Sequence, residues 1–175
     1  MKKLIFIFFP IILISCEESQ RKSGTQVKTD TQTTVYYLIR HAEKDTLNPK
    51  DPDPPLTDKG RKRAEKWAEI FKDIKFDAIY STDFNRTRLT AEPSAKSNNL
   101  NIILYKPNDI NIDTFKSETK GKTILIVGHS NSTPKFTNNL LDKKIYKQLD
   151  ESVYGNLYIV TIIGNKANSQ LLQIN

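Results

Sequence analysis

Short apolar runs rich in β-branched and aromatic residues recur along the sequence, and helix-like segments separate them. The run Val35-Tyr36-Tyr37-Leu38-Ile39 is continuous rather than alternating, which is typical of a strand buried on both faces within a parallel sheet. Alternating strand and helix patterns predict an α/β domain, a three-layer sandwich in which helices flank a mostly parallel central sheet. The other predicted strands are residues 76–80, 102–104, 123–127, 157–163 and 170–174.

The predicted helices carry start and stop signals. Thr57 is a candidate N-cap and Asp58 puts a carboxylate in the first turn, so we expect a helix to begin there. Pro93 lies inside the next helical pattern and should kink or end that helix, because proline has no backbone N–H. A short helix is expected near Pro134. The first helix shows an apolar stripe made of Ala64, Trp67, Ala68 and Phe71.

Residues 1–15 have the layout of a secretory signal. A short basic start, Met1-Lys2-Lys3, precedes an almost wholly apolar stretch. That stretch is too short to cross a bilayer, which takes about 20 apolar residues. The sequence Leu13-Ile14-Ser15-Cys16 resembles the bacterial lipoprotein cleavage box, in which the cysteine becomes the lipid-carrying first residue. We therefore expect residues 1–15 to be a signal peptide and Cys16 to anchor the protein to a membrane, outside the cytoplasm, facing the periplasm or the cell surface.

Residues 16–33 are expected to form a flexible tether. Beyond Cys16 the segment is rich in Ser, Thr, Gln and Lys, and Val27 is its one apolar residue, so it cannot bury enough surface to fold. Residues 34–175 remain for one domain with its own core. Without Lys2 and Lys3 the chain has 25 basic and 20 acidic residues, a net charge of +5. This modest excess tolerates anionic ligands, and no basic run with interleaved aromatics indicates a nucleic-acid partner.

The sequence contains two histidines, and each follows directly after a strong strand pattern. His41 comes after Leu38-Ile39-Arg40, and His129 comes after Ile126-Val127-Gly128. In open α/β sheets, ligands bind in the crevice beyond the carboxyl ends of the strands. We therefore expect both imidazoles to face one cleft.

Four segments, in order, resemble the motifs of the histidine phosphatase superfamily, the phosphoglycerate mutase-like proteins. Leu38 to Glu43 resembles the Arg-His-Gly signature, with Ala42 in the usual place of glycine. Together the four segments run from Val35 to about Leu140, and four motifs in the family's order are far more specific than one. The other three are Leu56-Thr57-Asp58-Lys59-Gly60 with Ala64, Ser81 to Thr87 with Thr90-Ala91, and Val127-Gly128-His129-Ser130-Asn131.

The resemblance implies a phosphatase without a cofactor, in which His41 attacks phosphorus and becomes a phosphohistidine that water then hydrolyses. The attacking nitrogen must be unprotonated, so the other ring N–H of His41 should donate to a backbone carbonyl or similar acceptor. Arg40 and Arg86 would bind the phosphate through their planar, permanently charged guanidinium groups, and His129 would add a hydrogen-bond donor. Ser130 is a further candidate, either for binding phosphate or for orienting His129.

The proton donor for the leaving group is less well defined by the sequence. Glu43 is the first candidate because it lies close to His41, although an exposed structural carboxylate is the alternative. Asp109 lies roughly where relatives place an acidic loop residue. Arg88 is two residues from Arg86 on the predicted helix and should point elsewhere, as a solvated surface charge. Residues 101–122 lack the Glu-rich stretch of the mutases, so the chain is similar to compact members such as phosphohistidine phosphatases.

Other interpretations of the sequence are weaker. Residues 128–132 approach the nucleophile elbow of α/β-hydrolases, but that fold needs a histidine after the serine and none follows His129. Two distant histidines and the single Cys16 give no metal-ligand pair. The main alternative to an enzyme is a catalytically inactive, lipid-anchored module that binds a phosphate ligand. We expect a metal-independent phosphatase acting on a phosphorylated small molecule or phosphoprotein.

Overall fold

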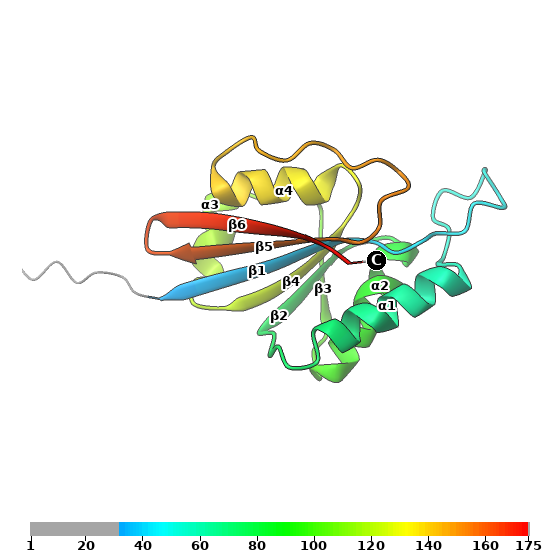
Figure 1. Cartoon of the computed structure of the whole chain (residues 1–175), viewed down its shortest axis with the longest axis horizontal. Helices are drawn as coiled ribbons and strands as arrows, with labels where there is room; N and C mark the ends of the chain where they lie inside the picture. Colours follow the sequence, from blue (N-terminus) through cyan, green and yellow to red (C-terminus); the bar gives the residue numbers. More distant parts are fainter. Residues whose placement is uncertain (1–31, 175) are drawn as a thin grey trace, which may run out of the picture.

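The predicted alternation of strands and helices is present in the computed structural model, which describes residues 32–174 (Figure 1). The elements are β1 (Thr33–Arg40), α1 (Asp58–Ile70), β2 (Ala78–Thr82), α2 (Asn85–Ser97), β3 (Ile102–Tyr105), α3 (Ile112–Glu118), β4 (Thr123–Gly128), α4 (Ser132–Leu141), β5 (Asn156–Ile163) and β6 (Lys166–Gln173). The signal segment, Cys16 and most of the tether lie outside the described residues. No helix among residues 32–174 has the length and apolar character needed to span a membrane.

All six of these strands form one sheet in the order β3-β2-β4-β1-β5-β6. β1, β2, β3 and β4 are mutually parallel, whereas β5 runs antiparallel to both β1 and β6. β1 lies between β4 and β5, which explains its continuous apolar run. The predicted α/β fold with a mostly parallel sheet flanked by helices is confirmed.

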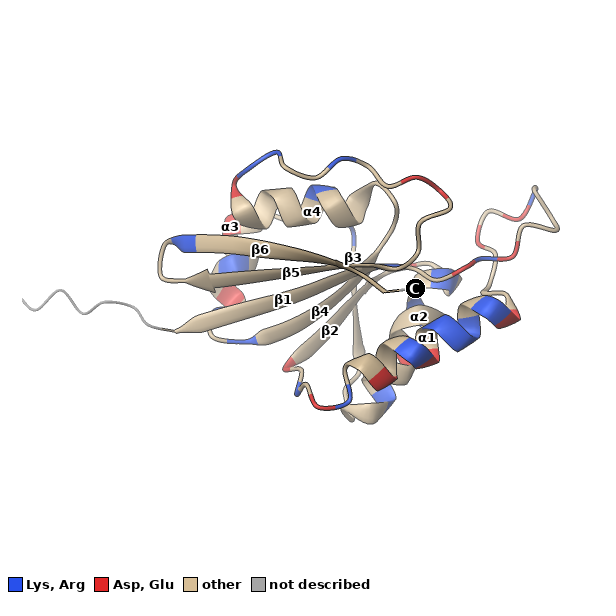
Figure 2. Cartoon of the chain, in the orientation of Figure 1, with Lys and Arg blue, Asp and Glu red and all other residues tan. Residues whose placement is uncertain are grey.

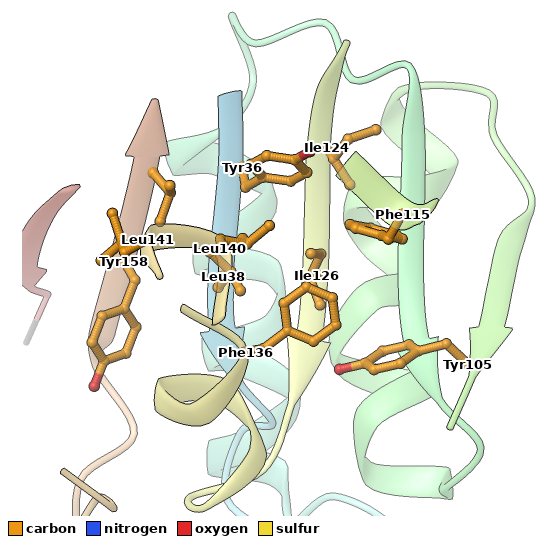
Figure 3. Close-up of a cluster of buried hydrophobic side chains, with 11 residues drawn as sticks. Tyr36, Leu38, Tyr105, Phe115, Ile124, Ile126, Phe136, Leu140, Leu141 and Tyr158 are labelled. Carbon is orange, nitrogen blue, oxygen red and sulfur yellow. The ribbon is translucent and has the colours of Figure 1, made fainter. Parts of the chain in front are cut away.

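Helices cover both faces of the sheet, so alternate residues of β1 enter two separate cores. Tyr36 and Leu38 pack with Phe115 of α3 and Phe136 of α4 (Figure 3). Ile39 packs on the opposite face, in the cluster that contains Trp67 of α1. Figure 1 shows α3 and α4 on one side of the sheet and α1 and α2 on the other. The result is the expected three-layer sandwich.

Several local expectations differ from the structure. The strand expected at residues 170–174 is β6 at Lys166–Gln173, and the strand expected at residues 76–80 is β2 at Ala78–Thr82. Pro93 was expected to kink or end this helix; α2 does not end there but continues to Ser97, and Ser94 and Ala95 of its last turn are buried. The seven-residue helix α3 was not predicted; its N-cap is Asn111, whose side chain accepts hydrogen bonds from the amides of Asp113 and Thr114. Such a short helix shows little periodicity, so its cap was the one available sequence signal.

The start of α1 is fixed against the segment that follows β1. Thr57 is the N-cap, as predicted, and its Oγ1 accepts a hydrogen bond from the amide of Gly60 at 3.0 Å. The amide of Thr57 donates to the carbonyl of Glu43 at 3.0 Å. A Cβ atom at Gly60 would lie 2.2 Å from that same carbonyl oxygen, so only glycine permits this approach. The Leu-Thr-x-x-Gly motif therefore holds the chain just after His41.

Candidate active site

The two histidines lie together beyond the carboxyl ends of the parallel strands. His41 follows β1 and His129 follows β4, and their ring centroids are 5.4 Å apart. A cavity of about 380 Å³ opens beside them. A larger cavity, about 980 Å³, lies between α4 and the β5-β6 hairpin, but no histidine lines it. The smaller cavity is lined by His41, Lys44, Phe84, Arg86, His129, Ser130, Asn131, Gln148 and Glu151.

His41 is held as a neutral imidazole with one free nitrogen. Its Nδ1 lies 2.7 Å from the carbonyl oxygen of Ala42; a carbonyl only accepts, so Nδ1 carries the hydrogen and Nε2 keeps its lone pair. Burial lowers the pKa of His41 to about 3, and the charges of Arg40 and Arg86 lower it further, against the hydrogen bond to Ala42. At neutral pH the Nε2 atom is therefore unprotonated, as a nucleophile requires.

His129 is positioned by the residues that follow β2. Its Nε2 lies 2.8 Å from Oγ1 of Thr82, which itself donates to Oγ1 of Thr87 at 3.0 Å. Because the hydroxyl hydrogen of Thr82 is used in that way, Thr82 accepts from Nε2–H of His129. Phe84 packs edge to face on the imidazole, with centroids 5.0 Å apart. Burial lowers the pKa of His129 to about 4, with the charge of Arg86 as the next cause.

Arg86 lines the cavity beside the two histidines. Its Nε and Nη1 atoms are buried and have no hydrogen-bond partner among residues 32–174. The guanidinium stacks over the Phe84 ring at 4.3 Å, and Nη1 lies 3.6 Å from the Asp53 carboxylate. Burial lowers the pKa of Arg86, although the charge of Asp53 opposes this shift. A buried cation with unused N–H groups is a favourable site for a planar, multiply charged anion.

Arg40, the other predicted phosphate ligand, is fully buried and is not on the cavity wall. Its Nη1 donates to the carbonyl oxygens of Asp150, Glu151 and Val153, each at 3.0 Å. Its Nη2 donates to the carboxylate of Glu151. The guanidinium also lies over the ring of Tyr154, at 4.3 Å from the centroid. The loop between α4 and β5 thus binds most of the Arg40 donors, and Nε alone is left without a partner among the described residues.

Ser130 has a different partner from the one that the sequence suggested. Its hydroxyl donates to Oε1 of Glu151 at 2.6 Å, while the backbone of His129 is held by Oγ of Ser132 at 3.0 Å. Glu151 therefore lies between two groups predicted to bind phosphate, Ser130 and Arg40. Arg86 and His41, rather than Ser130 and Arg40, are therefore the leading candidates for the residues that contact the phosphate.

Glu43 is not suited to be the proton donor. Arg63 donates to both of its carboxylate oxygens at 2.9 Å, and Lys59 lies 3.5 Å away. Burial raises the pKa of Glu43, but the hydrogen bonds and charge of Arg63 outweigh this, and the pKa is lowered overall. The carboxylate is therefore ionised at neutral pH and turned toward α1 rather than the cavity. Asp109 is exposed in a turn after β3 and does not line the cavity either.

Two other predictions from the sequence can be compared with the structure. Arg88 pairs with Asp83 and donates to Oδ1 of Asn85 at 2.9 Å, on the outer surface, so it is the solvated charge that we expected. Ala42, in the usual place of glycine, is buried in a small cluster with Leu56 and Ala64. Its amide donates to Oγ1 of Thr90 at 2.9 Å. The methyl group is thus accommodated without displacing His41.

Sequence reasoning missed several residues that shape the site. Thr82 and Phe84 lie within the third motif but received no role, and their place directly after β2 was the available signal. Glu151 and Tyr154 gave no signal, because they lie in a long loop without periodicity. Among residues 32–174, no group of three His, Cys, Asp or Glu side chains is placed to hold a metal ion.

Comparisons with known proteins agree with this geometry. The family model of the histidine phosphatase superfamily (branch 1) matches residues 36–106. No curated protein matches the chain. Solved structures share the fold at low sequence identity.

Three of these structures cover most of both chains. The protein histidine phosphatase SixA, complexed with tungstate, has 14% identity and a TM-score of 0.62, over 79% of this chain and 96% of its own. A phosphoserine phosphatase mutant from Entamoeba histolytica, in complex with phosphoserine, has 18% identity and a TM-score of 0.60, over 78% and 95%. Phosphoglycerate mutase from Bacillus anthracis has 14% identity and a TM-score of 0.59, over 82% and 94%.

Mild acid should destabilise the fold through the two histidines. Unfolded, both titrate near 6.5, whereas folded His41 titrates near 3 and His129 near 4, so below pH 6.5 the unfolded chain binds more protons. As pH falls from 6.5 toward 4, each histidine lowers the free energy of unfolding by up to about 1.4 kcal/mol per pH unit. Above about pH 7 both states are neutral and the contribution vanishes.

Urea unfolding at about pH 7.5, 6 and 5 measures this effect. A His41→Gln/His129→Gln double variant contains no histidine and should lose less stability over this range than the unmodified protein. An equal decrease in both proteins would show that the two imidazoles are not held neutral.

Proposed function

We propose that the chain is a metal-independent phosphatase of the histidine phosphatase superfamily, whose family model matches residues 36–106, and that it forms a covalent phosphohistidine intermediate on His41. Its substrate is a phosphomonoester or a phosphohistidine. The observation that carries this proposal is the neutral His41, whose Nδ1–H is bound by the Ala42 carbonyl. His41 lines the same cavity as Arg86, whose Nε and Nη1 atoms have no hydrogen-bond partner among residues 32–174.

The reaction proceeds in two displacements. In the first, the Nε2 lone pair of His41 attacks phosphorus, an N–P bond forms, and the bond from phosphorus to the leaving group breaks. In the second, water attacks phosphorus, the N–P bond breaks, and inorganic phosphate leaves while a water proton passes to solvent. Arg86 donates to the equatorial phosphoryl oxygens, where negative charge is spread in the transition state. The buried imidazole of His129 borders the same space and limits its width.

The site favours leaving groups that need little help from an acid. Glu43 is ionised and paired with Arg63, and the described cavity contains no other carboxyl than Glu151, whose pKa is also lowered, first by the hydrogen bond from Ser130. The leaving group therefore takes its proton from solvent. An aryl oxide or the imidazole of a phosphohistidine leaves more readily under these conditions than a simple alkoxide.

Turnover of an aryl phosphate by the detergent-solubilised full-length protein, with EDTA present, tests this function. We expect His41→Ala to lower kcat at least about a thousandfold, since it removes the nucleophile. Arg86→Ala should lower kcat/KM by about a hundredfold or more, because it removes the unpaired cationic donors.

Arg88→Ala is the matched control for Arg86→Ala. It removes an arginine from the same helix, two residues away, whose partners are on the outer surface, so activity should change less than about twofold. Turnover that survives His41→Ala would contradict the mechanism. Phosphate binding without turnover of an aryl phosphate or a phosphohistidine peptide would instead indicate the inactive binding module.

We further propose that the protein is anchored to a membrane through a lipid on Cys16 and acts outside the cytoplasm. The support is the basic and apolar segment before Cys16 and the polar tether after it. β1 begins at Thr33, so the tether joins the sheet at the end opposite the carboxyl ends of the parallel strands. An anchor there would leave the cavity accessible to a soluble or protein-bound substrate.

Metabolic labelling with a clickable fatty acid tests the anchor. We expect a label on the unmodified protein in the membrane fraction and none on Cys16→Ser, because Cys16 is the one cysteine in the chain. Equal labelling of both proteins, or none of either, would contradict lipidation at Cys16.

A further inference from the structure

The loop between α4 and β5, residues 142–155, closes over the carboxyl end of β1. Figure 1 shows it in orange, running along α4 and returning to the sheet where β5 starts. Its first half is tied down by Asn138, whose side chain bonds the backbone of Ile145 and Tyr146. Its second half is held by Arg40 and by the bond from the Leu149 amide to the Ser130 carbonyl at 2.9 Å. The loop is therefore a fixed wall of the site.

One carboxylate of this loop, that of Glu151, contacts two of the side chains that were predicted to bind phosphate. Glu151 accepts a hydrogen bond from Ser130 Oγ and another from Arg40 Nη2, and it lines the cavity beside His41 and Arg86. Figure 2 shows an acidic stretch, in red, in the loop between α4 and β5. A phosphoryl group bound to the same two donors would have to take the place of that carboxylate.

We propose that Glu151 is a specificity-determining residue that occupies the anion site and competes with the phosphoryl group for Arg40 and Ser130. This inference rests on the proposed function, since it concerns the same cavity. A carboxylate carries one negative charge, whereas a terminal phosphoryl group carries close to two and has three oxygens. Displacing Glu151 therefore favours a phosphomonoester over a singly charged phosphodiester.

Glu151 can give way without disturbing the loop. Its side chain is 66% exposed, in contrast to the fully buried side chain of Arg40. If the carboxylate turns into solvent, Arg40 Nη1 still donates to three carbonyl oxygens at 3.0 Å. Nη2 of Arg40 and the hydroxyl of Ser130 then become free for the ligand. The wall stays in place while the anion site opens.

The same competition acts on the product. Inorganic phosphate must leave before the next turnover. The ionised carboxylate of Glu151 weakens phosphate binding because it repels the phosphate and competes with it for the same hydrogen-bond donors. Glu151 thus raises both the KM for substrate and the inhibition constant for phosphate. Without it, the site would bind phosphate more tightly and release it more slowly.

Isothermal titration of the full-length protein with inorganic phosphate tests this role without requiring turnover. We expect Glu151→Gln and Glu151→Ala each to bind phosphate about tenfold more tightly, since each removes a negative charge and frees two donors. Asp109→Asn is the charge-matched control; Asp109 is exposed and does not line the cavity, so the Kd should change less than about twofold. In turnover assays the KM and the inhibition constant for phosphate should fall together.

The opposite role, in which Glu151 positions Arg40 for the ligand, gives the opposite result. Phosphate binding that is unchanged, weaker or absent in both folded Glu151 variants would overturn the inference. Circular dichroism checks that each variant is folded. If Glu151→Gln does not fold, phosphate binding is measured with Glu151→Ala. If the Glu151 variants bind phosphate more tightly but neither they nor the unmodified protein turn over substrate, the competition by Glu151 is upheld and the proposed phosphatase activity is rejected. The failure of this inference and the failure of the proposed function therefore give different results.

Discussion

The parallel pairing of β1 with β4 is the interaction on which the site depends. In the register of this pair Arg40 lies opposite Gly128, and the ladder continues one residue further through the bond from the His41 amide to the Gly128 carbonyl at 2.9 Å. Both histidines therefore leave the sheet at the same level. A slip of one residue would turn His41 to the other face of the sheet. The short distance between the two rings follows from backbone pairing, before any side-chain contact is considered.

Burial then determines what each charged or titratable group can do. His41 and His129 are neutral because the cavity disfavours an imidazolium among two arginines. The two arginines remain charged but differ in their partners: Arg40 is bound to the loop, whereas Arg86 has N–H groups without acceptors. A neutral nucleophile beside a cation that has N–H groups without hydrogen-bond acceptors is the arrangement that attack on a phosphoryl group requires. Glu151 adds an internal anion that keeps the other donors occupied.

The sequence predicted the elements with strong local signals and missed those defined by distant contacts. The Thr57 cap and the fold are confirmed by the structure, and the family model of the histidine phosphatase superfamily matches residues 36–106. The different surroundings of Arg86 and Arg88 follow from helical spacing. The ion pair of Glu43 with Arg63, which leaves Glu43 poorly suited to act as an acid, was not foreseen because Arg63 lies on another element. Glu151 was missed because an aperiodic loop gives no indication of where its side chains lie.

The most direct test of the account is the identity of the phosphorylated residue. The protein is mixed briefly with an aryl phosphate, quenched in alkali, where the N–P bond of phosphohistidine survives, and mapped by peptide mass spectrometry. We expect a phosphoryl group on Nε2 of His41, because Nδ1 is bound to the Ala42 carbonyl. A phosphoryl group on Nδ1 of His41, on His129 or on a serine, or product release without any phosphorylated histidine, would contradict it.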